Sequence, residues 1–317
     1  MSLASPPSLL EPWCRLEELF WAEEIPGVEP PTVAEVHYEL QPGLAERPVA
    51  FAVVDDGEVA ASYAGGEPLL ENLDLAFGWI TVGKRWRRQG VAGLLLEAAR
   101  AAHRVSGRGR LESSVRVGSA GSAFAAQAGA RVTQIELCNV LDVTRLPADL
   151  DALAATVPPG YVLRTWQGAC PDDLVDAYAA AHAAMNDAPR GQERQDPRWT
   201  AQRVRDAEDR QRRSGVVALT TAALHEATGA VGGYTDVLIT GRPTTVVQED
   251  TGVVRDHRGR GLGLLLKAAN LMRVRELMPE LATVVTWNAE NNQHMLAVND
   301  RLGFRPHSRW EEVALDL

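Results

Sequence analysis

The stretch GVVRDHRGRGLGLLL, residues 252–266, determines how the rest of the chain is interpreted. A second stretch, TVGKRWRRQGVAGLL at residues 81–95, matches it at one constant offset. The matched pairs are Val82 and Val253, Arg87 and Arg258, Gly90 and Gly261, and Ala92 and Gly263. A match of this kind indicates two copies of one domain rather than a short structural repeat.

Each motif lies in a similar order of predicted elements: a β-hairpin before it, then a helix, a strand and a shorter helix after it. In the first copy these are residues 49–63, 90–103, 111–117 and a helix ending at Gly129. In the second copy they are residues 216–239, 261–277, 283–286 and a helix ending at Gly303. Prolines near residues 147 and 158 interrupt the chain between the copies, so we predict domains at 1–150 and 151–317. The first fifty residues predict a helix around Trp13 and no clear opening strand.

Length and composition fit this organisation. A chain of 317 residues suits two domains of ordinary size, and 45% apolar with 23% charged residues excludes global disorder. The net charge of −10 disfavours general nucleic-acid binding, and no apolar run reaches the ~18 residues of a membrane span. The three cysteines and the histidines lack metal-ligand spacing, so we predict no metal site. With no recognisable secretory signal, a cytoplasmic location is expected.

The repeated loop has the features of an anion site. A strand that passes through a tight basic loop into a helix presents free backbone N–H groups and positive potential. For either copy alone, a glycine turn with solvated arginines is an equal alternative, and the repetition favours a phosphate. A P-loop is excluded because neither Gly-Lys-Ser nor Gly-Lys-Thr occurs, and the dinucleotide pattern GxGxxG fails because residue 264 is leucine.

Both copies resemble the acyl-CoA-binding motif of the GNAT N-acetyltransferase superfamily, Gln/Arg-x-x-Gly-x-Gly/Ala. The second copy also has an Asn-rich turn at residues 291–293 and a closing Leu302-Gly303-Phe304 that resemble the family. The resemblance covers nearly all of residues 160–317 and, less completely, about 45–145. It implies an α/β (α+β) fold of tandem GNAT-like domains. Each would have a mixed, mostly antiparallel central sheet whose parallel strands splay, flanked by helices.

The resemblance implies acetyl-CoA, or another acyl-CoA, as the acyl donor. In the second domain the implied contacts to the pyrophosphate are Arg258, Gly259, Arg260, Gly261 and Gly263. The implied contacts to the thioester and pantetheine are Val253, Val254, Asn288 and Asn292, and for Asn288 a turn-capping role is equally open. The corresponding residues of the first domain are Val82, Arg87, Arg88, Gly90 and Ala92.

The implied reaction is direct attack of an amine on the thioester, which requires a base. Similar enzymes often place a carboxylate on the strand before the motif. Glu249 shares strand parity with Val253 and is the first candidate, and Asp250 is the second, although both can also be surface charges at a strand end. Asn299 stands where many relatives carry an acidic tyrosine. An asparagine can donate a hydrogen bond to sulfur but is no acid at neutral pH, so the general acid stays open.

The first domain departs further from the family pattern. Gly78 and Trp79 replace the two carboxylates, and Gly118 and Ala125 replace Asn292 and Asn299. We therefore expect this domain to be catalytically silent, with retained or vestigial CoA binding.

Several functions stay open from the sequence. The leading one is N-acetyl transfer to a small-molecule primary amine by a monomer or homodimer, with no nucleic-acid or membrane partner. A non-catalytic module that binds CoA or another ligand is an alternative, as is acetylation of protein or peptide amines. O-acylation and a longer acyl chain are also open. The polar loop at residues 186–191, with Trp199 and Trp287, is a candidate part of the acceptor pocket.

Overall fold

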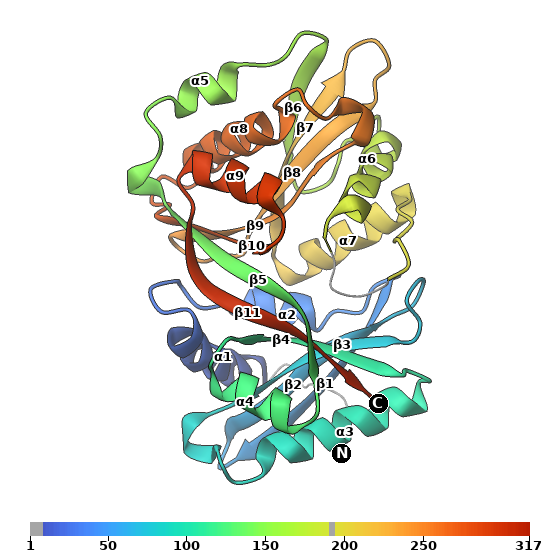
Figure 1. Ribbon diagram of the computed structural model, residues 1–317, viewed down its shortest axis with the longest axis vertical. Coiled ribbons are helices and arrows are strands. Elements are labelled where there is room, and N and C mark those ends of the chain that lie inside the picture. The colour runs from blue at the N-terminus through green and yellow to red at the C-terminus, as the bar shows by residue number, and fades with distance from the viewer. Residues whose placement is uncertain (1–8, 190–193) are drawn as a thin grey trace. The chain divides into compact units, whose positions relative to one another are not determined.

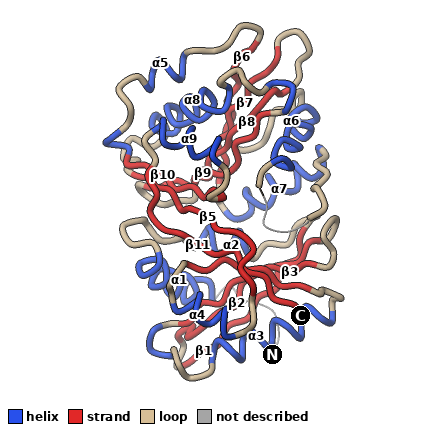
Figure 2. The backbone as a smooth tube through the Cα atoms, in the orientation of Figure 1, coloured by secondary structure: helices blue, strands red, loops and turns tan. Residues whose placement is uncertain are grey.

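The computed structural model describes residues 9–189 and 194–317, which form two compact units (Figures 1 and 2). Of the described residues, unit 1 comprises 9–136, 194–195 and 308–317, and unit 2 comprises 137–189 and 196–307. The last ten residues of the chain, 308–317, therefore belong to unit 1, although most of the chain after residue 137 belongs to unit 2. The predicted domain boundary at residue 150 rests on the sequence repeat. These compact units do not test it, so it stays a prediction.

Unit 1 contains the first copy of the motif. Its helices are α1 (Leu10–Glu24), α2 (Val33–Glu39), α3 (Val91–Val105) and α4 (Ala120–Gln127). Its strands are β1 (Glu46–Asp55), β2 (Glu58–Pro68), β3 (Leu75–Val82), β4 (Arg110–Arg116), the first half of β5 (Arg131–Asp142) and most of β11 (Arg305–Asp316).

The sheet of unit 1 is mixed, with the strand order β1-β2-β3-β4-β11-β5. Strands β3 and β4 are parallel neighbours, and they pair over Leu75–Phe77 before they separate. Because side chains alternate along β2, Tyr63 packs with α3 on one face while Ala64 packs with α1 and α2 on the other. The motif loop thus lies where β3 leaves its parallel neighbour.

Unit 2 contains the second copy. Its helices are α5 (Leu150–Ala155), α6 (Val175–Ala181), the 3₁₀ helix η4 (His182–Asp187), α7 (Ala201–Ser214), α8 (Leu262–Leu277) and α9 (Gln293–Leu302). Its strands, besides the second half of β5, are β6 (Tyr161–Gln167), β7 (Val217–His225), β8 (Val231–Ile239), β9 (Thr245–Val253) and β10 (Thr283–Ala289).

The sheet of unit 2 repeats the same plan, with the order β5-β10-β9-β8-β7-β6. Strands β6 to β9 are antiparallel, whereas β9 and β10 are parallel and pair only from Thr245–Thr283 to Val247–Val285. Figure 1 shows α8 and α9 on one side of β6 to β9, and α6 and α7 on the other. The main core joins α8, α9 and the sheet through buried residues such as Leu271 of α8, Leu302 of α9 and Val246 of β9.

These sheets confirm the predicted fold class, including the splayed parallel strands. The predicted hairpin at 49–63, the helix at 261–277 and the helix ending at Gly303 are also confirmed. The opening of the chain is helical, as predicted around Trp13, and its first strand begins only at Glu46.

Candidate active site

The anion cradle of unit 2 is the loop between β9 and α8, which includes the 3₁₀ helix η5 (Arg255–His257). Gly259 and Gly261 have φ angles of 74° and 76°, in the left-handed region that favours glycine. The first hydrogen bond of α8 runs from the Leu265 N–H to the Gly261 carbonyl (3.1 Å). The N–H groups just before Leu265 therefore point out of the helix end, where an anion can bind.

The space around this loop also fits a phosphate. A Cβ placed on Gly259 or Gly261 would meet no atom within 4 Å, and one on Gly263 would lie 3.9 Å from a methyl carbon of Val253. The backbone angle favours glycine at the first two positions, although Arg88 adopts it at the first position in the other copy. The third position accepts alanine there, as Ala92 shows. The loop thus fits the pyrophosphate of an acyl-CoA.

The motif arginines form hydrogen bonds with other groups of the protein. Arg258 donates from Nε to the Val253 carbonyl (2.9 Å) and from Nη2 to Asp187 Oδ2 (2.6 Å), while Arg255 donates to Asp187 Oδ1 (2.9 Å). Hydrogen bonds from the two arginines hold the pKa of Asp187 below its ordinary value. Arg260 donates to a carbonyl of its own loop (2.6 Å). The arginines therefore supply positive potential, and the backbone N–H groups supply the direct donors.

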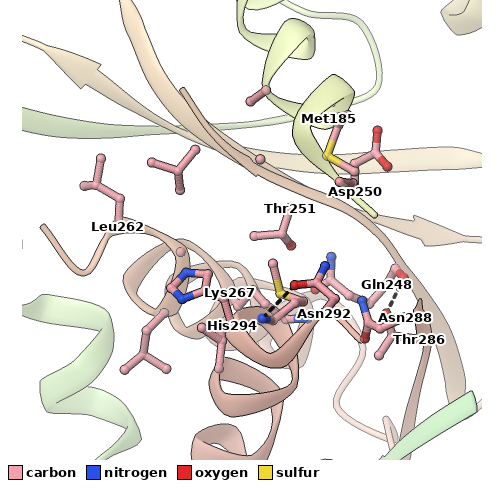
Figure 3. A pocket seen from close by; sticks show the side chains of 18 of the residues that line it. Met185, Gln248, Asp250, Thr251, Leu262, Lys267, Thr286, Asn288, Asn292 and His294 are labelled. Atoms are coloured by element: carbon pink, nitrogen blue, oxygen red, sulfur yellow. Dashed lines mark hydrogen bonds between the residues drawn. The ribbon is translucent and has the colours of Figure 1, made fainter. Parts of the chain in front are cut away.

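A cavity of about 680 Å³ opens between β9 and β10 and continues to the cradle (Figure 3). It begins just beyond the paired part of these strands, where Thr286 Oγ1 donates to the Gln248 carbonyl (3.1 Å). Residues 184–189 close another side, and Trp287 also lines the cavity. Residues 190 and 191 of the predicted polar loop lie outside the described residues.

One backbone N–H of β9 points into the cavity. The Val254 N–H donates to the Gly232 carbonyl (2.9 Å), so Val254 and Gly232 form a hydrogen-bonded pair of the antiparallel ladder. The neighbouring pair, Val253 and Gly233, is then a non-bonded pair whose polar groups point away from each other. The Val253 N–H therefore points toward the side where β10 has separated. Of the two valines predicted at the thioester, Val253 has the N–H that faces away from β8, whereas the Val254 N–H is bonded to Gly232.

Asparagines line the cavity on the β10 side. Asn292 Oδ1 accepts a hydrogen bond from the Met295 N–H (3.2 Å) and caps α9. Asn288 Oδ1 accepts one from Asn299 Nδ2 (2.6 Å), and Asn299 itself is buried. Asn292 is thus the N-cap of α9, and Asn288 fixes the side-chain amide of Asn299.

Two carboxylates follow one another on β9 at a β-bulge. Thr235 pairs with Thr251 but Val237 pairs with Gln248, so Glu249 and Asp250 lie opposite a single residue of β8. The preference for Glu249 assumes that side chains alternate regularly along β9. The bulge breaks that alternation. Glu249 is exposed, whereas Asp250 is partly buried.

The residue opposite this bulge is a third carboxylate, Asp236. Its Oδ1 is buried and has no hydrogen-bond partner among the described residues. Asp250 accepts a hydrogen bond from the Tyr234 hydroxyl (3.2 Å). Burial raises the pKa of Asp250 above its ordinary value. Burial, together with the charge of Asp250, also raises the pKa of Asp236. A base with a raised pKa can take a proton near neutral pH.

An aromatic cluster packs behind Asp250. The His182 ring stacks on Trp199 with 4.0 Å between ring centres, and its Nδ1 lies 2.9 Å from the Tyr234 hydroxyl. Burial, with a contribution from the charge of Arg203, lowers the pKa of His182 to about 3, so the ring is neutral. Trp199 therefore packs on this cluster, while Trp287 is the tryptophan that lines the cavity.

Lys267 is a functional candidate that the sequence reasoning missed. It lies on α8, lines the cavity and is 3% exposed. Its Nζ donates to Asn299 Oδ1 (2.7 Å) and lies 4.9 Å from the centre of the Phe304 ring. Burial lowers the pKa of Lys267 to about 7. The signal in the sequence was a single lysine within the apolar run of residues 262–272.

The loop of unit 1 has the same backbone geometry. Arg88 and Gly90 have φ angles of 63° and 82°, and Arg87 Nε donates to the Val82 carbonyl (2.9 Å) as Arg258 does to Val253. Ala92 lies in the first turn of α3. The predicted residues of the first copy are thus brought together in the same way.

In unit 1, however, a carboxylate of α1 approaches this loop. Glu23 accepts two hydrogen bonds from Arg87 (2.9 and 3.0 Å) and lies 3.5 Å from Lys84 Nζ. The hydrogen bonds from Arg87 hold the pKa of Glu23 below its ordinary value. A cavity of about 560 Å³ lies between α1 and the loop. Asp187 is the counterpart of Glu23 in unit 2, since each binds the motif arginine.

Comparison with solved structures identifies the family. A tandem GNAT protein from the clavulanic acid biosynthesis pathway is 31% identical to this chain, with a TM-score of 0.83. The similarity covers 99% of this chain and 97% of that one. The chain belongs to the GNAT superfamily. Tandem organisation and the fold of acyl-CoA-dependent N-acetyltransferases are thereby shown for this GNAT protein.

Two further solved structures share the fold. A GCN5-related N-acetyltransferase from Sphaerobacter thermophilus is 20% identical (TM-score 0.69) over 99% of this chain and 94% of that one. A GCN5-related glucosamine N-acetyltransferase region of a fungal multi-domain β-N-acetylglucosaminidase is 14% identical (TM-score 0.62) over 97% of this chain and 37% of that one. No protein-family model and no curated protein matches the sequence.

Two features are absent from the part of the chain that the structure describes. None of its helices is long and apolar enough to span a membrane. Nor do its His, Cys, Asp and Glu side chains form a cluster that could hold a metal ion.

Proposed function

We propose that this GNAT protein transfers the acetyl group of acetyl-CoA to a primary amine of a small molecule, and that the active site lies in unit 2. One observation carries the proposal: a single cavity joins the anion cradle to the carboxylates of the β9 bulge. Unit 1 has the cradle but carries Gly78 and Trp79 where unit 2 has Glu249 and Asp250.

The residues of unit 2 have separate tasks in this reaction. The N–H groups at the start of α8 bind the pyrophosphate, and Asn288 and Asn292 lie beside the pantetheine. The Val253 N–H donates to the thioester oxygen and stabilises the negative charge that develops there. When bound, acetyl-CoA supplies the activated acyl group.

Asp250 is the proposed base, and Glu249 is now the second candidate. A primary amine is protonated at neutral pH and must lose a proton before it attacks. Asp250 is the better acceptor of that proton because burial raises its pKa, while Tyr234 fixes one of its oxygens. Asp236, buried behind it, disfavours a second negative charge at the same place.

Thiol release from acetyl-CoA over a panel of amines tests the proposal. Asp250→Asn should lower kcat by about 10²- to 10⁴-fold, and Glu249→Gln by much less. Arg258→Glu should lower turnover at least tenfold more than Arg87→Glu, because only the former lies in the catalytic unit. If acetyl-CoA gives a calorimetric binding signal but no amine in the panel releases thiol, the protein is a binding module and the proposal fails.

A further inference from the structure

The acid that completes the transfer is still to be assigned. As the tetrahedral carbon collapses, the sulfur leaves with the electron pair of the carbon–sulfur bond. An alkyl thiol has a pKa of about 8.5 in water, and burial in a cavity raises the pKa further, so the departing thiolate needs a proton. The position at which the family resemblance implies a tyrosine holds Asn299, which has no proton to give at neutral pH.

We propose that Lys267 is the general acid that protonates the departing thiolate. This inference rests on the proposed function and assigns one more residue of the same site. Lys267 follows Gly263 by four residues, so both lie on one face of α8, and both line the cavity. The helix that holds the pyrophosphate therefore also carries the ammonium group.

The surroundings of Lys267 hold its ammonium in place without a counter-charge. The α9 residue Asn299 accepts its hydrogen bond (2.7 Å), and the amide of Asn299 is fixed in turn by Asn288 of β10 (2.6 Å). The face of Phe304 lies 4.9 Å from Nζ, a favourable arrangement for a cation. Neither the two amides nor the ring titrates near neutral pH.

The carboxylates of β9 are not ion-pair partners of Lys267. Burial alone accounts for its lowered pKa, and no charge of Glu249 or Asp250 contributes. In the view of Figure 3, Asp250 is drawn above Thr251, whereas Lys267 is drawn below it.

The other copy of the motif offers an internal comparison. At the offset that aligns Gly261 with Gly90, Lys267 aligns with Leu96 of α3. Leu96 is buried in the apolar core of unit 1. The buried lysine therefore occurs in the copy that has the β9 carboxylates and not in the copy that lacks them, as a catalytic role requires and a packing role does not.

The proton and electron balance of the step is complete. The nitrogen–carbon bond forms while the carbon–sulfur bond breaks, and the sulfur keeps the electron pair of the broken bond. One proton passes from the Lys267 ammonium to that sulfur, and the proton lost by the amine passes to Asp250. After the products leave, neutral Lys267 regains a proton from solvent and Asp250 loses one to it.

Lysine-selective NMR tests the proposal without any acceptor amine. The sequence contains two lysines, Lys84 and Lys267, so a protein labelled at lysine side chains gives one signal of interest and one internal control. The signal of Lys267 is assigned by its loss in Lys267→Met. Its pKa is then measured with CoA and with desulfo-CoA, which lacks the sulfur.

A hydrogen bond from the Lys267 ammonium to the sulfur favours the charged form of the lysine, so its pKa should be higher with CoA than with desulfo-CoA. Lys84 should titrate identically with both ligands. The Gly261→Val variant, whose helix start is disrupted, should abolish the difference. Equal pKa values of Lys267 in the two complexes would overturn the proposal. Loss of CoA binding to unit 2 altogether would instead refute the proposed function.

The pH dependence of turnover gives the second test. For the wild type, kcat should fall above about pH 7 as the acid is lost. Lys267→Met and Lys267→Gln should lower kcat by about 10²- to 10⁴-fold and remove this alkaline limb, with the KM for acetyl-CoA changed less than about threefold. Glutamine can still donate to Asn299, so it separates the acid from the hydrogen bond. Near-normal kcat in Lys267→Gln, or an alkaline limb that persists, would refute the assignment.

Discussion

Replacing Lys267 with methionine should stabilise the protein, and the gain should depend on pH. Burial lowers the pKa of this lysine from 10.5 to about 7. One pKa unit corresponds to about 1.4 kcal/mol, so keeping the charged form buried costs the folded state on the order of 5 kcal/mol at pH 6. Methionine removes that cost but leaves Asn299 Oδ1 without its donor, which costs about 2 kcal/mol. The net gain expected at pH 6 is about 3 kcal/mol.

The sign of the pH effect follows from proton binding. Below pH 7, folded and unfolded states both hold the proton, and the cost is constant. Between about pH 7 and 10.5 the unfolded state holds it and the folded state does not, so wild-type stability from this group rises with pH. At pH 9 the remaining cost is about 2 kcal/mol, which offsets the lost hydrogen bond. The gain from methionine should therefore fall to about zero.

Urea unfolding followed by circular dichroism at pH 6 and pH 9 measures both values. Lys84→Met is the matched control, because Lys84 is exposed and its replacement should change stability by less than about 0.5 kcal/mol at either pH. If Lys267→Met destabilises the protein at pH 6, burial does not disfavour the charge of this lysine and the reasoning is refuted. A gain in stability of the same size at both pH values would refute it as well.

Two further predictions concern the cradle of unit 2 and the core of unit 1. Valine at Gly261 cannot readily adopt the φ of 76°, so Gly261→Val should weaken acetyl-CoA binding to unit 2 at least tenfold; unchanged calorimetry would contradict the role of this loop. Glu67 is fully buried and binds His103 (2.7 Å) and Arg47, so Glu67→Gln should destabilise the protein by about 3–5 kcal/mol in urea unfolding. Glu97→Gln, which removes an exposed partner of Arg100, should cost less than about 1 kcal/mol, and equal losses would refute the argument.

The carboxylates illustrate where the sequence reasoning stopped. The residue pair Glu249 and Asp250 was found because it precedes the motif. Its order of preference rested on strict alternation along the strand. The bulge opposite Asp236 breaks that alternation, and a bulge depends on the register of two strands rather than on either strand alone. Sequence therefore narrows the proposed base to two adjacent residues, and the register separates an exposed side chain from a partly buried one.

The choice between the N–H groups of Val253 and Val254 also depends on strand pairing. Val253 and Val254 are adjacent and chemically alike, so the sequence cannot rank them. The hydrogen bond from Val254 to Gly232 shows which N–H belongs to the sheet and which faces the cavity. Lys267 is a harder case, because a lysine in a helix is normally exposed. Its burial depends on α9 and Phe304 covering that face of α8.

The sequence by itself determined that the chain carries one motif twice, that each copy is a strand, a glycine-containing loop and a helix, and that only the second copy has acids beside it. These properties are local, since glycine angles, helix starts and charges are set by residues close together in the chain. The tertiary structure decided three features of the cavity: the bulge, the direction of the Val253 N–H, and the hydrogen bonds that link Lys267 through Asn299 to Asn288. Such groups come from separate strands and helices, and only packing sets their distance, their burial and therefore their pKa.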